Sequence, residues 1–572
     1  MANGFGTLYV GASGLQMAQN AINTTANNIA NVDTAGYVRQ QVRFADRNYT
    51  QIKDVSRRTN IQQSGLGVSI GDVVHARDVF LDKSFRLENG RSSFYGALCK
   101  SSSYIEDLYQ ELDGEEFKAT VSELWTAVQE LAKTPDDSAS QNLLIQKSQL
   151  LVSRSQALYS DLKGYQNNLN LQIKEEVEKM NEIGNRIYEL NIEIQKIEAG
   201  GVETAMTLRD ERDKLIDDLS GYAGVTTLED ASGFLYVEIE GIQFIDDGSC
   251  RNIGLKEEEG TGFYTPYWPH ISNVSRNDYA YVFRTDVEID SEFNNDVGSV
   301  KAKLLTRGDG YGHYYHLENE ENYKAVEKSL VMENQAEVEK LFHSIVTTMN
   351  NVFCPNKELD AELELADGTK LPEGTKILDV ERCTVGTDGK IPPRELFVRA
   401  GIERYTEVTG ADGKTYYVYN EETEYGSADF DTNTLYGIGN TSVQEELTKQ
   451  VTLLPMWSQN GAVSYDLAQA VKEAWSQGGI TLNPYDKEPV NFESFYDKMI
   501  NNLGTIGNTY KAATETLEAT AASIESNRQQ VTGVSNDEEL TKMIKYQSAY
   551  NAASRFISVI SDMTELIVTG LI

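Results

Sequence analysis

The sequence predicts a multidomain α+β protein made of a terminal α-helical coiled-coil domain, a helical-bundle domain and mainly β insertion domains. Both ends of the chain carry apolar residues at heptad spacing, helical patterns lie next inward, and alternating strand patterns fill the middle. A length of 572 residues also exceeds what one hydrophobic core usually organises. Because this order is nearly palindromic, the two ends of the chain are able to meet.

The N-terminal segment predicts a helix with one narrow apolar stripe, since Leu8, Leu15, Ile22 and Ile29 lie seven residues apart. Its other positions are rich in Asn and small residues, which are mediocre helix formers. Packing against another element must therefore stabilise this helix. The periodicity stops before Gly36, a residue that suits a turn.

Residues 38–222 predict a short β element near 38–75 followed by helices. Thr134 to Asp137 contains a proline and marks a break between helices. The strongest coiled-coil pattern runs from Leu169 to Ile197 and ends at a glycine pair, after which a second helix follows. In that second helix the run Arg209 to Asp213 is interpreted as mixed surface charge.

Two stretches in the middle of the chain, 225–322 and 356–491, predict strands joined by Asp-Gly turns. A helical pattern lies between them at 323–352, and helix returns at residue 492. The predicted division has three parts: 1–37 plus 533–572 as the terminal domain; 38–222 plus 323–355 plus 492–532 as the helical domain; and 225–322 plus 356–491 as the mainly β outer domain or domains.

The last helix carries two apolar stripes. The first includes Met543, Tyr550, Ile557, Ile560 and Ile567. The second consists of Ala549, Ala552, Phe556, Val559, Met563 and Leu566. A helix that is apolar on two faces must be covered on both, and one partner helix is not enough. Packing of Leu15 and Ile22 on Ile557 and Ile560 would cover only one of them.

We therefore hypothesise that both ends are mobile in the monomer and become ordered only when neighbouring subunits cover them. A conventional bundle within one chain is the alternative, and periodicity alone does not separate the two. Limited proteolysis does, because resistant ends in a dilute monomer would refute mobile ends.

The composition limits the partners. The chain has 51 Lys and Arg against 88 Asp and Glu, a formal net charge of −37. Nucleic acids and anionic membranes attract clustered cations, so neither is an expected partner. No window approaches the roughly 20 apolar residues that span a bilayer, so we expect a soluble protein. The start of the chain also lacks the pattern of a cleaved secretory signal.

The side chains predict no catalytic, cofactor or metal site. His313 and His316 lie near Asp309 and Glu318, but the HxxH pattern lacks the HExxH spacing, so we expect exposed loop side chains. His343 is interpreted as a helix-surface histidine. The tripeptide from Arg307 to Asp309 is explained by a turn rather than by adhesion. Cys99, Cys250, Cys354 and Cys383 are widely spread, and the sequence leaves open whether any of them pair.

The segments Ser13–Gln19 and Asn27–Tyr37 resemble the N-terminal signature of the flagellar rod, hook and hook-associated axial proteins. A difference from the usual pattern occurs at Ala35, which is often proline in that family. Segments at 77–82, 208–215, 533–540 and 546–550 also fit its hook-associated members. The residues that carry the signature are Asn27, Asn28, Ile29, Ala30, Asn31, Thr34, Gly36 and Tyr37.

The resemblance implies a structural, non-enzymatic component of the bacterial flagellum, the first protein of the junction between hook and filament. It implies terminal helices that stack into an inner tube, and flagellar type III export without a cleaved signal to an extracellular position. The implied partners are further copies of the chain, the hook protein, a second hook-filament junction protein and a cytosolic export chaperone at the C-terminal helix. The alternatives are another axial protein, such as the hook or second junction protein, and a secreted hydrolase or adhesin carried by the β insertion.

Overall fold

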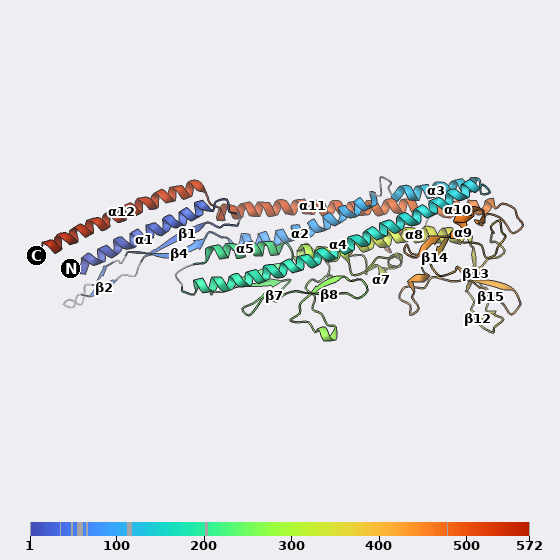
Figure 1. Cartoon of the computed structure of the whole chain (residues 1–572), viewed down its shortest axis with the longest axis horizontal. Helices are drawn as coiled ribbons and strands as arrows, with labels where there is room; N and C mark the ends of the chain where they lie inside the picture. The colour runs from blue at the N-terminus through green and yellow to red at the C-terminus, as the bar shows by residue number, and fades with distance from the viewer. Residues whose placement is uncertain are drawn as a thin grey trace.

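The computed structural model is a long, narrow molecule with both chain termini at the same end (Figure 1). It describes residues 2–34, 36–46, 50–53, 61–64, 67–110, 117–200, 204–477 and 479–570. The predicted multidomain α+β class is confirmed, because long helices carry several small antiparallel sheets. No helix in the described ranges has the length and apolar character needed to pass through a bilayer.

The end that holds both termini is formed by two helices, α1 (Ala2–Ala30) and α12 (Asn536–Thr569), which we call the terminal rod. They run antiparallel and lie side by side (Figure 1). An antiparallel ribbon of β1 (Gln40–Asp46) and β4 (Val68–His75) follows α1, and a second pair, β2 (Thr50–Lys53) and β3 (Ile61–Ser64), extends it. These strands occupy the short β element predicted near 38–75.

A bundle of long helices forms the centre of the molecule, which we call the body. Its helices are α2 (Val79–Gln110), α3 (Phe117–Lys133), α4 (Ser138–Glu198), α5 (Met206–Ser220), α8 (Leu330–Phe353) and α11 (Phe492–Thr532). The predicted break lies between α3 and α4, where Asp137 caps α4 by accepting a hydrogen bond from the Ala139 amide. The coiled-coil pattern is thus the second half of one 61-residue helix.

The first outer region packs on the side of α4. It contains a three-stranded sheet of β5 (Val225–Glu229), β6 (Leu235–Ile239) and β7 (Ile242–Ile245), and a hairpin of β8 (Gly254–Glu257) and β9 (Tyr264–Tyr267). The strand pattern predicted over 225–322 does not continue as named strands beyond β9. Two helices follow instead, α6 (Ser299–Arg307) and α7 (Glu320–Tyr323). Val300 and Leu304 lie one helical turn apart and are buried in the core. This spacing is typical of a helix, but the tyrosine-rich segments on either side favoured a strand prediction.

The second outer region forms the far end of the molecule. Its strands are β10 (Asn356–Glu358), β11 (Leu363–Glu364), β12 (Lys370–Leu371), β13 (Lys376–Leu378), β14 (Phe397–Arg399), β15 (Tyr405–Thr409), β16 (Thr415–Tyr419) and β17 (Thr441–Val443). Two helices missed from the sequence are α9 (Glu445–Lys449) and α10 (Tyr465–Gln477). Ala468, Val471 and Trp475 of α10 are buried against the body, so packing decides its structure.

The expected helix at 323–352 begins later than predicted. Ser329 caps α8, and its hydroxyl accepts a hydrogen bond from the Met332 amide. The residues before it form α7 and an irregular segment. A capping serine seven residues inside an apolar pattern shows why periodicity alone misplaced the boundary.

A glycine in α4 allows the first outer region to pack closely. A Cβ on Gly184 would lie 2.3 Å from Cζ of Phe244 and 2.9 Å from Sγ of Cys250. Phe244 belongs to β7 and is fully buried. The missing side chain at Gly184 therefore provides the space that this ring occupies.

We predict that Gly184→Ala destabilises the protein by about 1–3 kcal/mol, because the added methyl overpacks the Phe244 contact. Gly164→Ala is the matched control, since Gly164 lies in the same helix with no atom within 4 Å of its Cβ position. That control should stabilise the protein by about 0.5–1 kcal/mol through helix propensity. Urea unfolding of both variants measures the difference, and equal midpoints would contradict the packing account.

Candidate assembly surface and its joint with the body

The two helices of the terminal rod contact each other through small residues of α1. A Cβ on Gly11 would lie 2.8 Å from Cγ1 of Ile557, and one on Gly14 would lie 3.8 Å from Cβ of Ala553. Gly11 thus lies against Ile557. The pairing of Leu15 and Ile22 with Ile557 and Ile560 stays a prediction, while the contact at Gly11 shows that α12 approaches α1 closely where α1 has no side chain.

The residues expected to form the assembly helices lie partly within this contact. Each of the following is half-buried: Leu8, Leu15, Ile22, Ile29, Met543, Tyr550, Ile557 and Ile560. Ile567 belongs to α12, but its side chain lies outside the described ones. In each helix of the rod, the flank that carries these residues is thus partly covered by the other helix.

The second apolar stripe of α12 is exposed to solvent. The exposed fraction is 42% for Phe556, 51% for Val559, 58% for Met563 and 75% for Leu566. Ala549 and Ala552 of the same stripe are exposed as well. Because these positions recur every three or four residues, they form one continuous apolar face. Its edge touches α1, since a Cβ on Gly11 would lie 3.0 Å from Cδ1 of Phe556, while most of the face is open to solvent. We call these six residues the open stripe.

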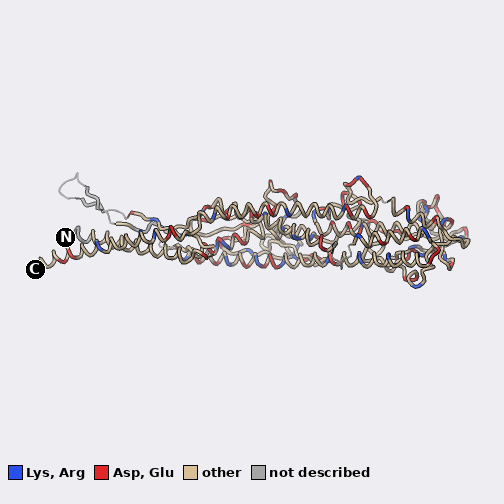
Figure 2. The backbone as a smooth tube through the Cα atoms, turned by 90° about the horizontal axis from the view of Figure 1, so that it is seen from above, with Lys and Arg blue, Asp and Glu red and all other residues tan. Residues whose placement is uncertain are grey.

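One helix of the terminal rod, α1, carries no charge, and the five acidic and three basic residues of α12 nearly balance. Residues 2–32 contain no Lys, Arg, Asp or Glu, whereas the whole chain carries a formal charge of −37. Figure 2 shows charged residues along the body and few on the rod. Rods can therefore approach one another with little electrostatic repulsion.

Asn28, a residue of the signature, connects three segments where the rod meets the body. Its Nδ2 donates to the Gln40 carbonyl (2.9 Å) and to Oε2 of Glu539 (3.0 Å), and its Oδ1 accepts from the Tyr37 hydroxyl (2.8 Å) and the Gln40 amide (3.0 Å). Asn28 is 1% exposed and Glu539 is 1% exposed. The carboxylate of Glu539 is balanced by Lys542 at 2.6 Å. Every polar atom of the Asn28 side chain is thus satisfied.

The other signature residues form the turn that follows α1. Asn31 donates to the Asn27 carbonyl, Thr34 donates to Oδ1 of Asn31, and Gly36 adopts a φ of +83°. Ala30, Asn27, Thr34 and Gly36 are exposed, while Ile29 and Tyr37 are half-buried. Ala35, where the sequence differs from the family pattern, lies outside the described residues. The signature therefore specifies a turn, with Asn28 as its buried anchor.

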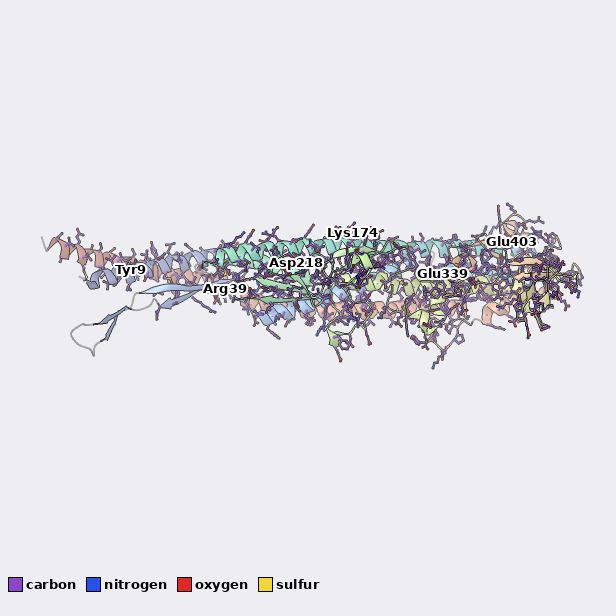
Figure 3. The ribbon with its side chains drawn as sticks, turned by 90° about the horizontal axis from the view of Figure 1, so that it is seen from below. Tyr9, Arg39, Lys174, Asp218, Glu339 and Glu403 are labelled. Carbon is purple, nitrogen blue, oxygen red and sulfur yellow. The ribbon has the colours of Figure 1, made fainter. Side chains whose placement is uncertain are left out.

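The chain passes between the rod and the body three times, and Arg39 connects these three segments. The Arg39 amide donates to the Thr532 carbonyl (2.8 Å), and the Arg39 carbonyl accepts from the Ala76 amide (3.1 Å). Its side chain forms an ion pair with Glu538 at 3.2 Å. Figure 3 labels Arg39 at this boundary between the rod and the helical body.

Below this joint, six side chains form a closed ring of alternating charge that we call the ion ring. It links α2, α5 and α11, and each member contacts two others. In order around the ring they are Arg77, Asp82, Arg528, Asp217, Arg86 and Asp213. Breaking one partner of such a buried set leaves an uncompensated charge, so the ring fixes the relative position of the three helices. The guanidinium of Arg528 also lies 4.4 Å from the ring of Phe85.

The interpretation of Arg209 to Asp213 as surface charge was wrong for part of the run. Arg212 is 1% exposed and donates to Oδ1 of Asn191 (2.9 Å) and the Gly233 carbonyl. Asp210 is 7% exposed and accepts from the Val38 amide at 3.2 Å. Alternating signs along a helix did not reveal that one face of α5 lies against Val38, α4 and β5.

Asp210 also lies 3.3 Å from Nε2 of His75. Burial raises the pKa of Asp210 to about 7, against the effects of the Val38 amide and Arg77, and burial lowers the pKa of His75 to about 4, with Arg77 and Arg209 acting in the same direction. Between these values the folded pair holds one proton. In the unfolded chain, with pKa values of 3.8 and 6.5, the pair also holds one proton over most of that range. We therefore expect it to add little pH dependence to stability.

The histidines expected on exposed loops are not there. His316 is 6% exposed, and its Nδ1 accepts a hydrogen bond from the His313 amide. Nδ1 of His313 lies 2.9 Å from Oε2 of Glu339. His343 is stacked on Tyr314 at 3.8 Å rather than placed on the helix surface. Aromatic packing with Tyr314 and Tyr315 buries this segment, which the HxxH spacing could not show.

Arg307 is 1% exposed, so the start of the adhesion-like tripeptide is not accessible. Its guanidinium donates to Oδ1 of Asn170 and lies over the ring of Phe263. None of the four cysteines forms a disulfide. Among the residues that the structure describes, no group of three or more His, Cys, Asp or Glu side chains is arranged to hold a metal.

Comparison with known families matches three parts of the chain. Residues 102–305 match the flagellar hook-associated protein FlgK helical domain, residues 8–37 match the flagella basal body rod protein family, and residues 526–569 match the flagellar basal body rod FlgEFG protein C-terminal family. The last two matches cover the rod and the signature turn.

Two curated relatives match over nearly the whole chain. Flagellar hook-associated protein 1 of Bacillus subtilis (strain 168) is 24% identical over 100% of this chain and 99% of its own length. The protein of the same name from Escherichia coli (strain K12) is 22% identical over 97% of this chain and 98% of its own. The chain is thus similar over nearly its full length to flagellar hook-associated protein 1 sequences. This similarity, together with the match of residues 102–305, supports a structural role in the bacterial flagellum.

The fold is similar to that of a solved protein. A solved structure described as the flagellar hook junction protein FlgK from Burkholderia pseudomallei has a TM-score of 0.50 and 11% sequence identity, and the match covers 79% of this chain and 100% of the other. A hook protein, FlgE of Borreliella burgdorferi, is 33% identical over 109 residues, which is 16% of this chain and 25% of its own length.

We predict that Asn28→Ala destabilises the terminal rod by about 1–3 kcal/mol, because it leaves buried groups of Glu539 and Gln40 without partners. Asn27→Ala is the matched control, since Asn27 is exposed and bonds only within its own helix turn. Amide hydrogen exchange of residues 8–34 and 536–560 measures the effect. Equal protection in the two variants would contradict the role of Asn28 as an anchor.

Proposed function

We propose that this chain joins the flagellar hook to the filament as the first protein of that junction, and that copies assemble around a common axis through their terminal rods. The open stripe of α12 is the observation that supports this most directly. An apolar face of six residues on an otherwise folded helix remains in contact with water in a single chain, and such faces mark interaction sites.

The free energy available from burying the open stripe suits an assembly of repeated subunits. Burying one exposed Leu, Val, Phe or Met side chain contributes about 1.5–3 kcal/mol when burial is complete. Several such side chains per copy give a modest contact between two subunits. Because each copy in a tube contacts several neighbours, modest contacts add up to a stable assembly.

Charge favours contact through the rods over contact through the bodies. The acidic surface of the body repels the same surface of a neighbour, while α1 of the rod is uncharged and the charges of α12 nearly balance. We infer that the terminal domain of 1–37 plus 533–572 lies nearest the axis. The helical domain of 38–222, 323–355 and 492–532 then lies outward, followed by the insertions of 225–322 and 356–491.

We propose that the other partners are the hook protein on one side and a second hook-filament junction protein on the other. Before assembly, a cytosolic export chaperone would cover the open stripe at the C-terminal helix. Export through the flagellar type III apparatus, without a cleaved signal peptide, would place the protein outside the cell. The names of the relatives and their full-length similarity support this proposal.

The alternative of a hook protein is less well supported. The hook protein match covers 16% of this chain, whereas hook-associated protein 1 sequences match 95% or more of it. We propose no catalytic activity and no cofactor, since the relatives carry structural names.

We predict that the double variant Val559→Glu, Met563→Glu abolishes filament attachment in a strain that lacks the wild-type gene. Two carboxylates on the open stripe would have to be buried against a neighbour, which costs several kcal/mol per ion. Ser558→Glu is the matched control, because Ser558 is exposed on a different side of the same helix. Filaments are counted by electron microscopy, and secreted filament protein is measured in the medium.

The gene deletion itself should leave hooks intact while filament protein escapes unassembled. The double variant should reproduce this phenotype while the chain still reaches the medium, and the control should restore filaments. Normal filaments in the deletion strain would refute the junction role. Filaments in the double variant would refute assembly through the open stripe.

A further inference from the structure

The first half of α8 is buried on all sides, although it is rich in polar residues. Every residue from Leu330 to Glu339 is buried, because α2, α4, α6, α11 and the second outer region surround it. Figure 3 labels Glu339 deep within the body. Glu339 has partners, since its carboxylate accepts from the amides of Tyr314 and Ile438 and lies 2.9 Å from His313.

Glu333 and Glu337 differ from Glu339 in their surroundings. They lie one helical turn apart and are 9% and 3% exposed. Oε1 of Glu333 accepts a hydrogen bond of 2.5 Å from the Tyr323 hydroxyl. Two neighbouring buried carboxyl groups cannot both ionise without a large cost in free energy.

The segment from Glu318 to Ser329, which we call the cover, lies over this pair. Tyr323 and Val326 of the cover pack with Leu317, Met332 and Ala336 in a small apolar cluster of their own. Tyr323 is held on its other side by an edge contact with the ring of Tyr485, which is itself 53% exposed. The cover thus has few apolar anchors, and its central contact is the bond to Glu333.

Charged groups around the pair add to the cost of ionisation. Burial raises the pKa of Glu333, and the charge of Glu327 in the cover raises it further. Burial also raises the pKa of Glu337, and the charge of Glu333 adds to that effect. Lys340 acts in the opposite direction on Glu337, and burial lowers the pKa of Lys340 itself to about 8. Titratable groups face the pair from four elements. They are Tyr109 of α2, Tyr510 of α11, Lys340 of α8, and Glu318, Tyr323 and Glu327 of the cover.

We propose that the cover is a proton-controlled element, which stays closed over α8 while Glu333 and Glu337 carry protons and is released when they lose them in alkaline solution. Release brings water to the two carboxylates and exposes the apolar cluster beneath Tyr323. The cover carries four acidic residues, at 318, 320, 321 and 327, against two lysines, at 324 and 328, so its net negative charge favours separation from the ionised pair. This inference does not depend on the role of the terminal rod.

The direction of the pH effect follows from the sign of the shifts. Burial raises the pKa of both carboxyl groups above the value of 4.5 that they have in the open or unfolded chain. Their contribution to closure is therefore complete below pH 4.5 and is lost as the pH rises through the raised values. Loss of the Lys340 proton near pH 8 removes the cation that offsets the charge on Glu337, so release should be clearest above pH 8.

The test is amide hydrogen exchange of the intact chain at pH 6 and pH 9, corrected for the chemical exchange rate. We expect the protection factors of residues 318–329 to fall by about tenfold or more at pH 9 in the wild type, since one unit of pKa corresponds to a factor of ten. Glu337→Gln should keep the protection of pH 6 at pH 9. Glu321→Gln is the control: it removes an exposed carboxylate of the same segment and should behave as wild type.

Equal protection of the wild type at both pH values would overturn the proposal, and so would an undiminished fall in Glu337→Gln. Peptides from α4 show in each sample whether the body is still folded. If Glu337→Gln does not fold, Tyr323→Phe decides, with its protection compared with that of the same variant at pH 6. The lost hydrogen bond lowers protection at every pH, but it also raises the pKa of Glu333, so the fall in protection with pH should begin at higher pH. An unchanged or lower pH of release in that variant would contradict the proposal.

Discussion

The structure depends on a helix with more apolar surface than its own chain can cover. α12 packs one flank on α1, where Gly11 and Gly14 allow close approach, and leaves Phe556, Val559, Met563 and Leu566 in contact with water. Covering the open stripe requires a second molecule. The neutral surface of α1 and the acidic surface of the body then determine where that molecule can contact the chain.

A rod that transmits contacts along an axis must also hold a fixed direction relative to its body. Two sets of buried polar groups provide this. Asn28 connects α1, β1 and α12, and the ion ring that includes Arg528 connects α2, α5 and α11 directly below. Buried polar groups of this kind stabilise little in net terms, but they penalise other arrangements strongly. They therefore specify geometry more than they add stability.

Much of this architecture could be predicted from the sequence, because it rests on periodicity. The heptad positions of α1, the two stripes of α12 and the turn at Gly36 each leave a local pattern. Contacts between distant segments leave none. Glu539 as the partner of Asn28, the closure of the ion ring and the burial of His316 depend on which helices meet. The helix α6 was missed because nine residues among tyrosine-rich strands give too short a pattern to outweigh their flanks.

The most direct test of the central idea is hydroxyl-radical footprinting of α12 in the isolated chain and in purified flagella. Met563 and Phe556 report on the open stripe, and Tyr9 of α1, which is 65% exposed, reports on the other helix of the rod. If neighbouring copies cover the stripe, Met563 and Phe556 will be oxidised readily in the monomer and will be protected in flagella. Equal oxidation of both residues in the two states would contradict assembly through this face.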